Sequence, residues 1–310
     1  MKLKDNKVFW LIIFFVSSSF AILINKYILW KLNFTYPSIF QSWQMSVASL
    51  FLISANSFEI IKIMPLSTES FKRLLPSTFL FTVSIYSGSK ALSMLPVPIF
   101  CLIQQMFIQA TIYIVEIYKT KKSMSNYQAV CIMTPLFIIW ITYLFDNEYE
   151  NQVKYVWILI NCLCICLNSI YISFFKSINV QEIDKIFLNT KSSIIFLSLF
   201  GILTGETPKV INFQKLYHTF FHLLFVGSGV FGALMMLSYG RLCNLFSLSR
   251  VRFFNAISMF IVSIASIIVY DTKTSVYKLW FAVLGLASVS YYSYSVSKFN
   301  YQLGLKNQEV

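Results

Sequence analysis

The feature that most constrains this chain is a series of apolar runs, each about long enough to cross a lipid bilayer. A bilayer core about 30 Å thick needs roughly 20 apolar residues in one helix. Charged residues make up only 12% of the 310 residues, and they are grouped between these runs. Hydrophobic residues account for 57% of the sequence, and the mean hydropathy is +0.68. We therefore predict an all-α membrane protein with no separate soluble domain.

Ten apolar segments can be placed between the charged clusters. Five segments in each half suggest two repeats, residues 1–150 and 151–310, since an odd number of helices inserts the second repeat upside down. Short matches such as "ILINKYI" with "CLNSIYI" favour this inverted repeat, which in transporters places a site near the membrane midplane. The segments cover approximately Val8–Trp30, Ser38–Phe58, Leu74–Leu95, Val97–Tyr118, Tyr127–Phe145, Tyr155–Phe175, Ile186–Leu203, Phe220–Leu242, Val251–Tyr270 and Leu279–Val296.

The positive charges predict the orientation of the chain. The termini and even-numbered connections hold 16 of the 25 Lys and Arg residues, the odd-numbered connections hold 6, and 3 lie inside predicted helices. Because cytosolic loops carry an excess of Lys and Arg, both termini are expected in the cytosol. Topology and anionic lipid headgroups thus account for most of the net charge of +13, and no nucleic-acid partner is expected.

Three lysines fall inside the predicted helices, where a central charge costs roughly 2.5–3.5 kcal/mol. Lys26 and Lys191 are close enough to a helix end to reach headgroups, which leaves their role open. Lys90 lies in "YSGSK", whose small and hydroxyl residues are typical of a water-lined face. Acidic residues are expected only in loops and near helix ends. The lysines should therefore lack negative neighbours, and this predicts an anionic ligand.

The ninth segment carries a polar stripe. Arg252 and Asn255 are spaced i, i+3 on one helix face, with Ser258 beside them. Such a stripe can be interhelical hydrogen bonding alone, but the planar guanidinium of Arg252 also suits a pair of phosphate oxygens. Gln44 in the second segment and Gln104 in the fourth add neutral donors and acceptors. The six cysteines show no metal-ligand spacing, so we expect no metal or other cofactor.

Several stretches resemble nucleotide-sugar transporters of the drug/metabolite transporter superfamily, particularly the fungal GDP-mannose transporters. These stretches include "SGSKALSMLPVPIF", "NKYIL", "QSWQMSVAS", "LINCLCICLNSIYISFF" and "FLNT", and the region from "GSGV" to "IIVYD". The resemblance covers nearly the whole chain. It implies a ten-helix fold with two inverted five-helix repeats.

Two family motifs map onto this sequence with changes. The nucleotide-binding FYNN motif falls on Phe187, Leu188, Asn189 and Thr190, followed here by Lys191. The GALNK motif falls on residues 255–259, where only the Ala is kept and Met259 replaces the lysine. A basic position in the fourth helix has become Gln104. These replacements suggest that Arg252, two turns before Met259 on the same face, takes over part of the phosphate contact.

The resemblance implies an antiporter, not an enzyme, in the Golgi or endoplasmic reticulum membrane. It would move a nucleotide-sugar such as GDP-mannose into the lumen in exchange for a nucleoside monophosphate. Two alternatives remain open: a phosphorylated-metabolite translocator of the triose-phosphate type, and a transport-inactive membrane scaffold. A homodimer is one further assembly that the sequence leaves open.

Overall fold

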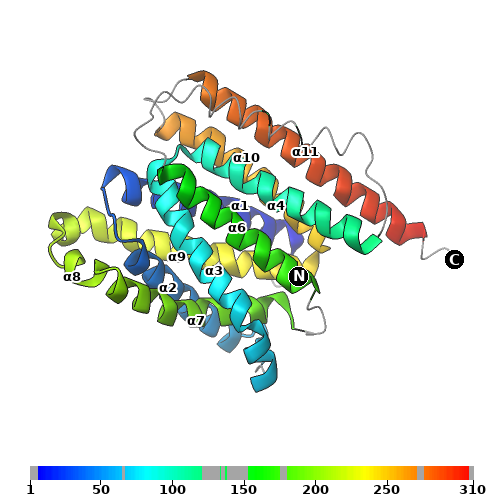
Figure 1. Ribbon diagram of the computed structural model, residues 1–310. Coiled ribbons are helices and arrows are strands. Elements are labelled where there is room, and N and C mark those ends of the chain that lie inside the picture. The colour runs from blue at the N-terminus through cyan, green and yellow to red at the C-terminus, as the bar shows by residue number, and fades with distance from the viewer. Residues whose placement is uncertain are drawn as a thin grey trace. The chain divides into compact units, whose positions relative to one another are not determined.

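A computed structural model describes residues 6–64, 67–120, 153–174, 180–270 and 276–306, together with positions 133 and 137. These parts are helical apart from short connections, as Figure 1 shows. The long helices are α1 (Lys7–Lys26), α2 (Pro37–Ser57), α3 (Thr68–Met94), α4 (Val97–Thr120), α6 (Val153–Phe174), α7 (Glu182–Leu203), α9 (Thr219–Leu245), α10 (Leu248–Val269) and α11 (Val276–Lys306). Three short helical elements join them: η2 (Tyr27–Lys31), α8 (Glu206–Val210) and η4 (Gln214–Tyr217).

Each long helix overlaps one predicted segment, but α3 begins at Thr68 and not at Leu74, and α11 ends at Lys306 and not at Val296. The predicted segment Tyr127–Phe145 lies outside the described residues, so the count of ten remains a prediction. Within the described ranges, six helical stretches have the length and hydropathy to cross a membrane. They are Lys7–Lys31, Val97–Val115, Val153–Phe174, Glu182–Leu203, Thr219–Leu245 and Leu248–Val269.

Helix ends follow from local side chains. The Asn6 side chain accepts hydrogen bonds from the backbone N–H groups of Val8 and Phe9, at 3.1 and 3.2 Å, and so caps the start of α1. Pro37 occupies the first position of α2, where a missing N–H costs nothing. At the end of α7, Gly205 adopts φ +66°, a left-handed conformation that ends the helix and turns the chain into α8.

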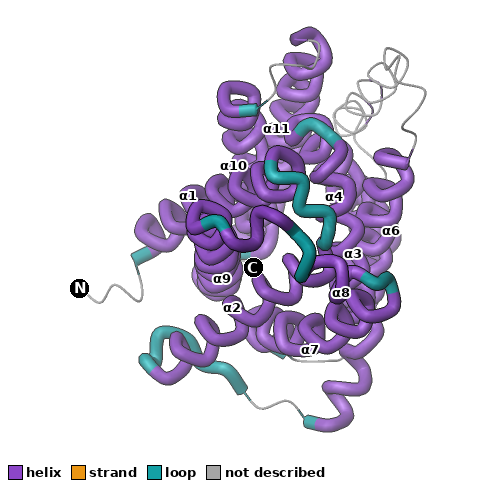
Figure 2. The backbone as a smooth tube through the Cα atoms, turned by 90° about the vertical axis from the view of Figure 1, so that its left-hand side faces the viewer, coloured by secondary structure: helices purple, strands orange, loops and turns teal. Residues whose placement is uncertain are grey.

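The chain divides into two compact units, each containing parts of both halves of the sequence. Unit 1 contains Met1–Met94 and Lys154–Leu245. Within it, α1 packs against α9, and α2 packs against both α7 and α9. Figures 1 and 2 show α1 beside α9 from two directions. Unit 2 contains Leu95–Val153 and Phe246–Val310, and its described helices α4, α10 and α11 pack against one another.

Hydrogen bonds join the first and the seventh connections at one end of unit 1. Ser38, at the start of α2, donates its backbone N–H to Glu206 of α8 at 2.9 Å. Lys215 of η4 donates to the Leu32 carbonyl at 3.3 Å. The connection between α1 and α2 therefore lies beside the connection between α7 and α9. This proximity agrees with the predicted alternation of the segments across a membrane.

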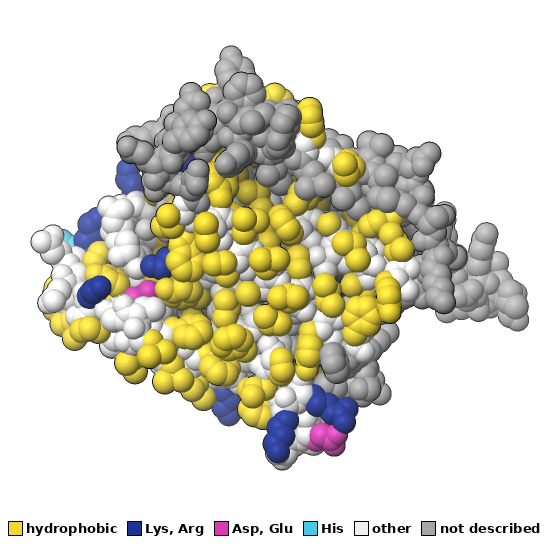
Figure 3. Space-filling view, in the orientation of Figure 1, with side chains coloured by type: hydrophobic (Ala, Val, Ile, Leu, Met, Phe, Trp, Pro, Cys, Tyr) yellow, Lys and Arg dark blue, Asp and Glu magenta, His cyan; other side chains and the backbone are white. Residues whose placement is uncertain are grey.

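A lipid-facing surface is evident on α6. Its exposed apolar side chains, Val156, Leu159, Leu163 and Leu167, recur at intervals of three or four residues and so form one stripe. Asn161, by contrast, is buried. In Figure 3, hydrophobic side chains cover most of the described part of one face, with Lys and Arg toward its edges. An exposed apolar surface of this kind indicates contact with lipid.

Leu163→Lys should impair membrane insertion of α6. A lysine near the centre of a spanning helix costs roughly 2.5–3.5 kcal/mol, so the apparent free energy of insertion should rise by about 3 kcal/mol. A glycosylation-based insertion assay on α6 measures this value. Leu203→Lys, measured in the same way on α7, is the control because exposed Leu203 ends its helix and a lysine there can reach headgroups. Equal penalties at the two positions would contradict a lipid-facing stripe on α6.

Candidate functional site

Polar side chains of α3 connect it to α7 inside unit 1. The Thr78 hydroxyl donates to Asn189 Oδ1 at 3.0 Å. One turn further along both helices, the hydroxyls of Thr82 and Ser193 lie 2.8 Å apart. Thr78, Thr82 and Ser193 are fully or almost fully buried. The predicted nucleotide-binding residue Asn189 is therefore held by α3, which fixes the orientation of its amide.

A second side of α3 contacts α6. The Ser77 hydroxyl donates to Asn168 Oδ1 at 2.6 Å, and Asn161 Nδ2 donates to the Ser84 carbonyl at 2.7 Å. A Cβ atom added to Gly88 would lie 2.8 Å from Asn161 Nδ2. The small residues around Lys90, interpreted above as a water-lined face, thus also serve close helix packing.

The predicted residues on α7 point in different directions. Thr190 is completely buried, and its hydroxyl donates to the Phe187 carbonyl of its own helix at 2.9 Å. Lys191 is exposed, with its ammonium 5.6 Å from the centroid of the half-buried Phe187 ring. Among these neighbours, Asn189 is the one with a described hydrogen bond to another helix. This result separates Lys191 from the inward-facing residues of the motif.

The glutamines of α2 are paired with neighbouring helices. Gln44 Nε2 donates to Asn25 Oδ1 of α1 at 2.8 Å, and Gln41 Nε2 donates to Ser89 Oγ of α3 at 2.6 Å. Both glutamines are buried. In this conformation, the Gln44 amide nitrogen predicted to contact substrate is engaged within the protein.

Lys26 lies inside unit 1 and does not reach toward headgroups. Its side chain is only 2% exposed, and its ammonium donates to the Leu92 carbonyl of α3 at 3.0 Å. The ammonium also lies 5.1 Å from the centroid of the Trp30 ring, within cation–π range. Snorkelling, one of the two interpretations of Lys26, is therefore wrong for this conformation.

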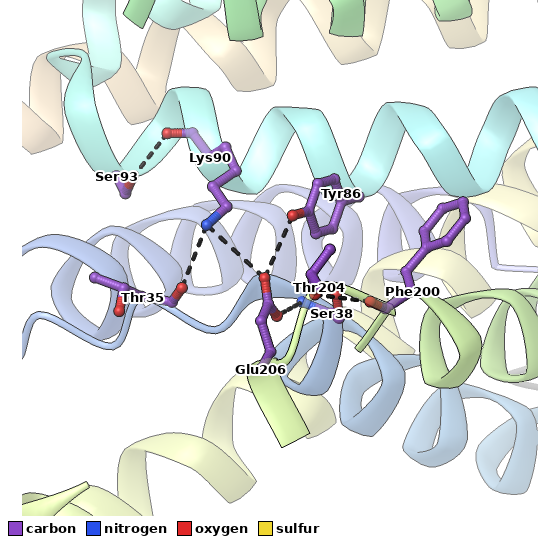
Figure 4. Close-up of polar contacts among 8 residues, drawn as sticks. All are labelled: Thr35, Ser38, Tyr86, Lys90, Ser93, Phe200, Thr204 and Glu206. Carbon is purple, nitrogen blue, oxygen red and sulfur yellow. Dashed lines mark hydrogen bonds and ion pairs between the residues drawn. The ribbon is translucent and has the colours of Figure 1, made fainter. Parts of the chain in front are cut away.

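The expectation that Lys90 lacks a negative neighbour is also wrong. Its ammonium lies 3.8 Å from Glu206 Oε1 and donates to the Thr35 carbonyl at 3.4 Å. Glu206 is only 6% exposed and accepts further hydrogen bonds from the Ser38 N–H and the Tyr86 hydroxyl, at 2.9 and 3.3 Å. Figure 4 shows these groups converging on the carboxylate.

In the sequence, Glu206 lies in the stretch "TGETPK", which predicts a loop between two helices. The structure turns this segment inward at Gly205, so that Glu206 begins α8 as a buried residue. A glycine followed by an acidic residue is a helix-end and helix-start signal. That signal reveals α8, but it gives no indication that the carboxylate meets Lys90, more than 100 positions earlier.

The remaining predicted residues belong to unit 2. The α4 and α10 helices are antiparallel neighbours, as Figure 1 shows, and Cys101 Sγ lies 3.7 Å from Met259 Sδ. Gln104 lies about one turn beyond Cys101 on α4, and Asn255 lies about one turn before Met259 on α10. The antiparallel arrangement therefore brings Gln104 to about the same level as Asn255.

Two polar side chains of α10 are available for a ligand. Arg252 and Asn255 are half-buried, and neither hydrogen-bonds or forms an ion pair with another residue in the described part of the chain. Ser258, on the same helix, is completely buried. A half-buried guanidinium without a carboxylate partner favours an anion.

Gln105 adds an unpaired amide on α4. The residue is 1% exposed, and within the described part of the chain neither its Nε2 nor its Oε1 has a hydrogen-bond partner. An unsatisfied buried polar group costs about 1–3 kcal/mol, so its retention needs an explanation. Its position next to Gln104 is the sequence signal for this residue.

Comparison with known proteins identifies the family. No family model matches the chain. The UDP-N-acetylglucosamine transporter TMEM241 of Mus musculus is 32% identical over 224 residues, covering 71% of this chain and 73% of that protein. The chain belongs to the nucleotide-sugar transporter family. Family members are transporters and not enzymes, which agrees with the sequence-based expectation.

Other members of the nucleotide-sugar transporter family are similar over comparable lengths. The TMEM241 homologue of Xenopus laevis, named as a UDP-N-acetylglucosamine transporter, is 27% identical over 85% of this chain and 87% of its own length. GDP-mannose transporter 1 of Neosartorya fischeri is 23% identical over 66% of this chain and 57% of its own. A solved crystal structure with 11% identity has a TM-score of 0.56, covering 91% of this chain and 96% of that one, and so shares the fold.

Gly88→Ala should destabilise this family member. The new methyl group would push the Asn161 amide from its bond to Ser84, and overpacking of this kind costs about 1–3 kcal/mol. Gly232→Ala on α9 is the control, because an added Cβ there meets nothing within 4 Å. That change should be neutral or slightly stabilising through helix propensity. Melting of the purified protein measures both, and equal melting temperatures would refute close packing at Gly88.

Proposed function

We propose that this protein carries a nucleotide-sugar across the Golgi or endoplasmic reticulum membrane in exchange for a nucleoside monophosphate. Both termini lie in the cytosol in this proposal, consistent with the distribution of Lys and Arg. The observation that carries the proposal is the 32% identity to the mouse TMEM241 transporter over most of both chains.

The comparisons favour a UDP-sugar over GDP-mannose as the substrate. The relatives with 32% and 27% identity are named as UDP-N-acetylglucosamine transporters, whereas the GDP-mannose transporter of Neosartorya fischeri is 23% identical. The departures from the FYNN and GALNK motifs point the same way, because both belong to the GDP-mannose resemblance. We therefore propose UDP-N-acetylglucosamine as the first substrate to test.

The charged part of the substrate would bind to α10 and α4. A nucleotide-sugar carries a diphosphate, and the fork of Arg252 can donate two parallel hydrogen bonds to phosphate oxygens. Asn255, Gln104 and Gln105 would supply neutral hydrogen bonds that replace water around the sugar or the phosphates. Within unit 1 taken by itself, Asn189, whose amide oxygen accepts from Thr78, is a candidate contact for the base.

The helix pairings support an inverted repeat as the basis of alternating access. In the predicted repeat, α1, α2 and α3 correspond to α6, α7 and α9. When each helix is replaced by its counterpart in the other repeat, the pair α2 and α9 becomes the pair α7 and α3. In the same way, the pair α2 and α3 becomes the pair α7 and α9. All four pairs are in contact in unit 1. Such symmetry lets a carrier open alternately toward either side of the membrane.

Exchange in proteoliposomes tests the proposed function. Vesicles containing the purified protein are preloaded with UMP, GMP or inorganic phosphate, and uptake of labelled UDP-N-acetylglucosamine and GDP-mannose is measured. We expect UDP-N-acetylglucosamine uptake that depends on internal UMP. Uptake driven by inorganic phosphate, with inhibition by phosphoenolpyruvate, would instead indicate a phosphorylated-metabolite translocator. No uptake, together with no melting shift by any nucleotide, would favour a transport-inactive scaffold.

Arg252→Ala should lower kcat/KM for uptake by roughly 10- to 100-fold, because a hydrogen bond to a charged group contributes about 1.5–3 kcal/mol. Arg252→Lys should retain part of the activity, since it keeps the charge but loses the bidentate geometry. Arg73→Ala is the matched control: Arg73 is exposed and paired with Glu69 of its own helix. Normal uptake by the Arg252→Ala variant would exclude Arg252 as the phosphate contact.

A further inference from the structure

One buried acidic residue of unit 1 joins segments that are far apart in the sequence. Glu206 of α8 contacts Ser38 at the start of α2 and Tyr86 and Lys90 near the end of α3. Lys90 also reaches the Thr35 carbonyl in the connection before α2. These groups lie at the end of unit 1 where the connection between α1 and α2 meets the connection between α7 and α9, and Figure 4 shows their contacts in close-up. They tie the second half of the chain to the first at that end.

The carboxylate is held by two kinds of interaction. Oε2 accepts from the Ser38 N–H, which belongs to the first turn of α2 and has no partner within that helix. The positive end of the α2 dipole also favours a negative charge there. Oε1 accepts from the Tyr86 hydroxyl and faces the Lys90 ammonium at 3.8 Å. The Ser38 bond needs only an acceptor, whereas the Lys90 interaction needs the charge.

The ion pair is enclosed but long. The side chains of Lys90 and Glu206 are 24% and 8% exposed, so water screens them less than it screens a surface pair. Their separation of 3.8 Å exceeds the 2.7–2.9 Å of a close charge-assisted hydrogen bond. An ion pair of this length and burial stabilises one conformation but can still separate.

The connection that carries Glu206 begins at a glycine with open surroundings. It contains the five-residue α8 and then η4, and it follows Gly205, which adopts φ +66° and has no atom of the described residues within 4 Å of an added Cβ. A rotation at this glycine would withdraw Glu206 from α2 and α3, and it would act against the 3.3 Å bond from Lys215 of η4 to the Leu32 carbonyl. The contacts of Glu206 would then no longer hold α8 against the start of α2 and the end of α3.

We propose that the Lys90–Glu206 ion pair is a lock that keeps this end of unit 1 closed, and that the end opens when the pair separates. The inference builds on the proposed transport function, which requires each end to open in turn. The lock stabilises one of the two conformations by electrostatics, so loss of either charge shifts the population toward the open one.

Thiol accessibility tests the lock without measuring transport. Ser89→Cys is introduced into a full-length variant in which all other cysteines are replaced. Ser89 is 5% exposed and hydrogen-bonds Gln41, one turn deeper on α2 than Ser38. The rate of reaction with a water-soluble maleimide then reports opening at this end. Glu206→Gln keeps an acceptor for Ser38 and removes the charge, and Lys90→Met removes the cation but keeps most of the stem.

We expect both variants to react at least fivefold faster than the parent, and Lys90→Arg to react within twofold of it. Glu69→Gln, which removes a carboxylate from an exposed ion pair on α3, is the control and should leave the rate unchanged. Melting curves confirm that each variant is folded. Unchanged rates in both Glu206→Gln and Lys90→Met would overturn the lock, even if Glu206→Ala accelerated labelling, since that pattern describes a helix cap only. The readout holds whether or not the vesicles take up a nucleotide-sugar.

Discussion

The structure depends on the satisfaction of polar groups where water is scarce. A helix forms the hydrogen bonds of its own backbone N–H and C=O groups, but hydroxyl, amide and ammonium side chains need partners on neighbouring helices. Unit 1 does this along α3, where Thr78 and Thr82 bond to α7 and Ser77 and Ser84 bond to α6. One of these bonds also holds Asn189, a predicted binding residue, so the same contacts that pack the helices fix the orientation of its amide.

The two units differ in how their polar groups are paired. In unit 1, Lys26 donates to a carbonyl oxygen and Lys90 faces Glu206. In unit 2, Arg252 has no ion-pair partner among the described residues, and Gln105 is buried with an unpaired amide. The expected cationic site for phosphate is therefore better supported on α10 than at Lys90. For Lys90 we propose instead a role in keeping one end of unit 1 closed.

Family membership agrees with this division of roles. A carrier for a diphosphate needs unpaired donors at the binding position and reversible contacts at its ends, because permanent bonds would arrest one conformation. Arg252 and Asn255 fit the first requirement, and the long pair between Lys90 and Glu206 fits the second. Neither requirement can be met by apolar residues, which explains why these groups persist in such a hydrophobic sequence.

The sequence by itself determined the described helices and the family. Each apolar run must form its backbone hydrogen bonds within its own helix, and the family motifs are continuous stretches. Only the tertiary structure decided the partners of the buried polar residues. The turn at Gly205 brings Glu206 to Lys90, and the packing of α3 against α7 brings Thr78 to Asn189. Those contacts join positions separated by more than 100 residues, and helical periodicity describes one segment at a time. It therefore carries no information about which helix supplies the partner.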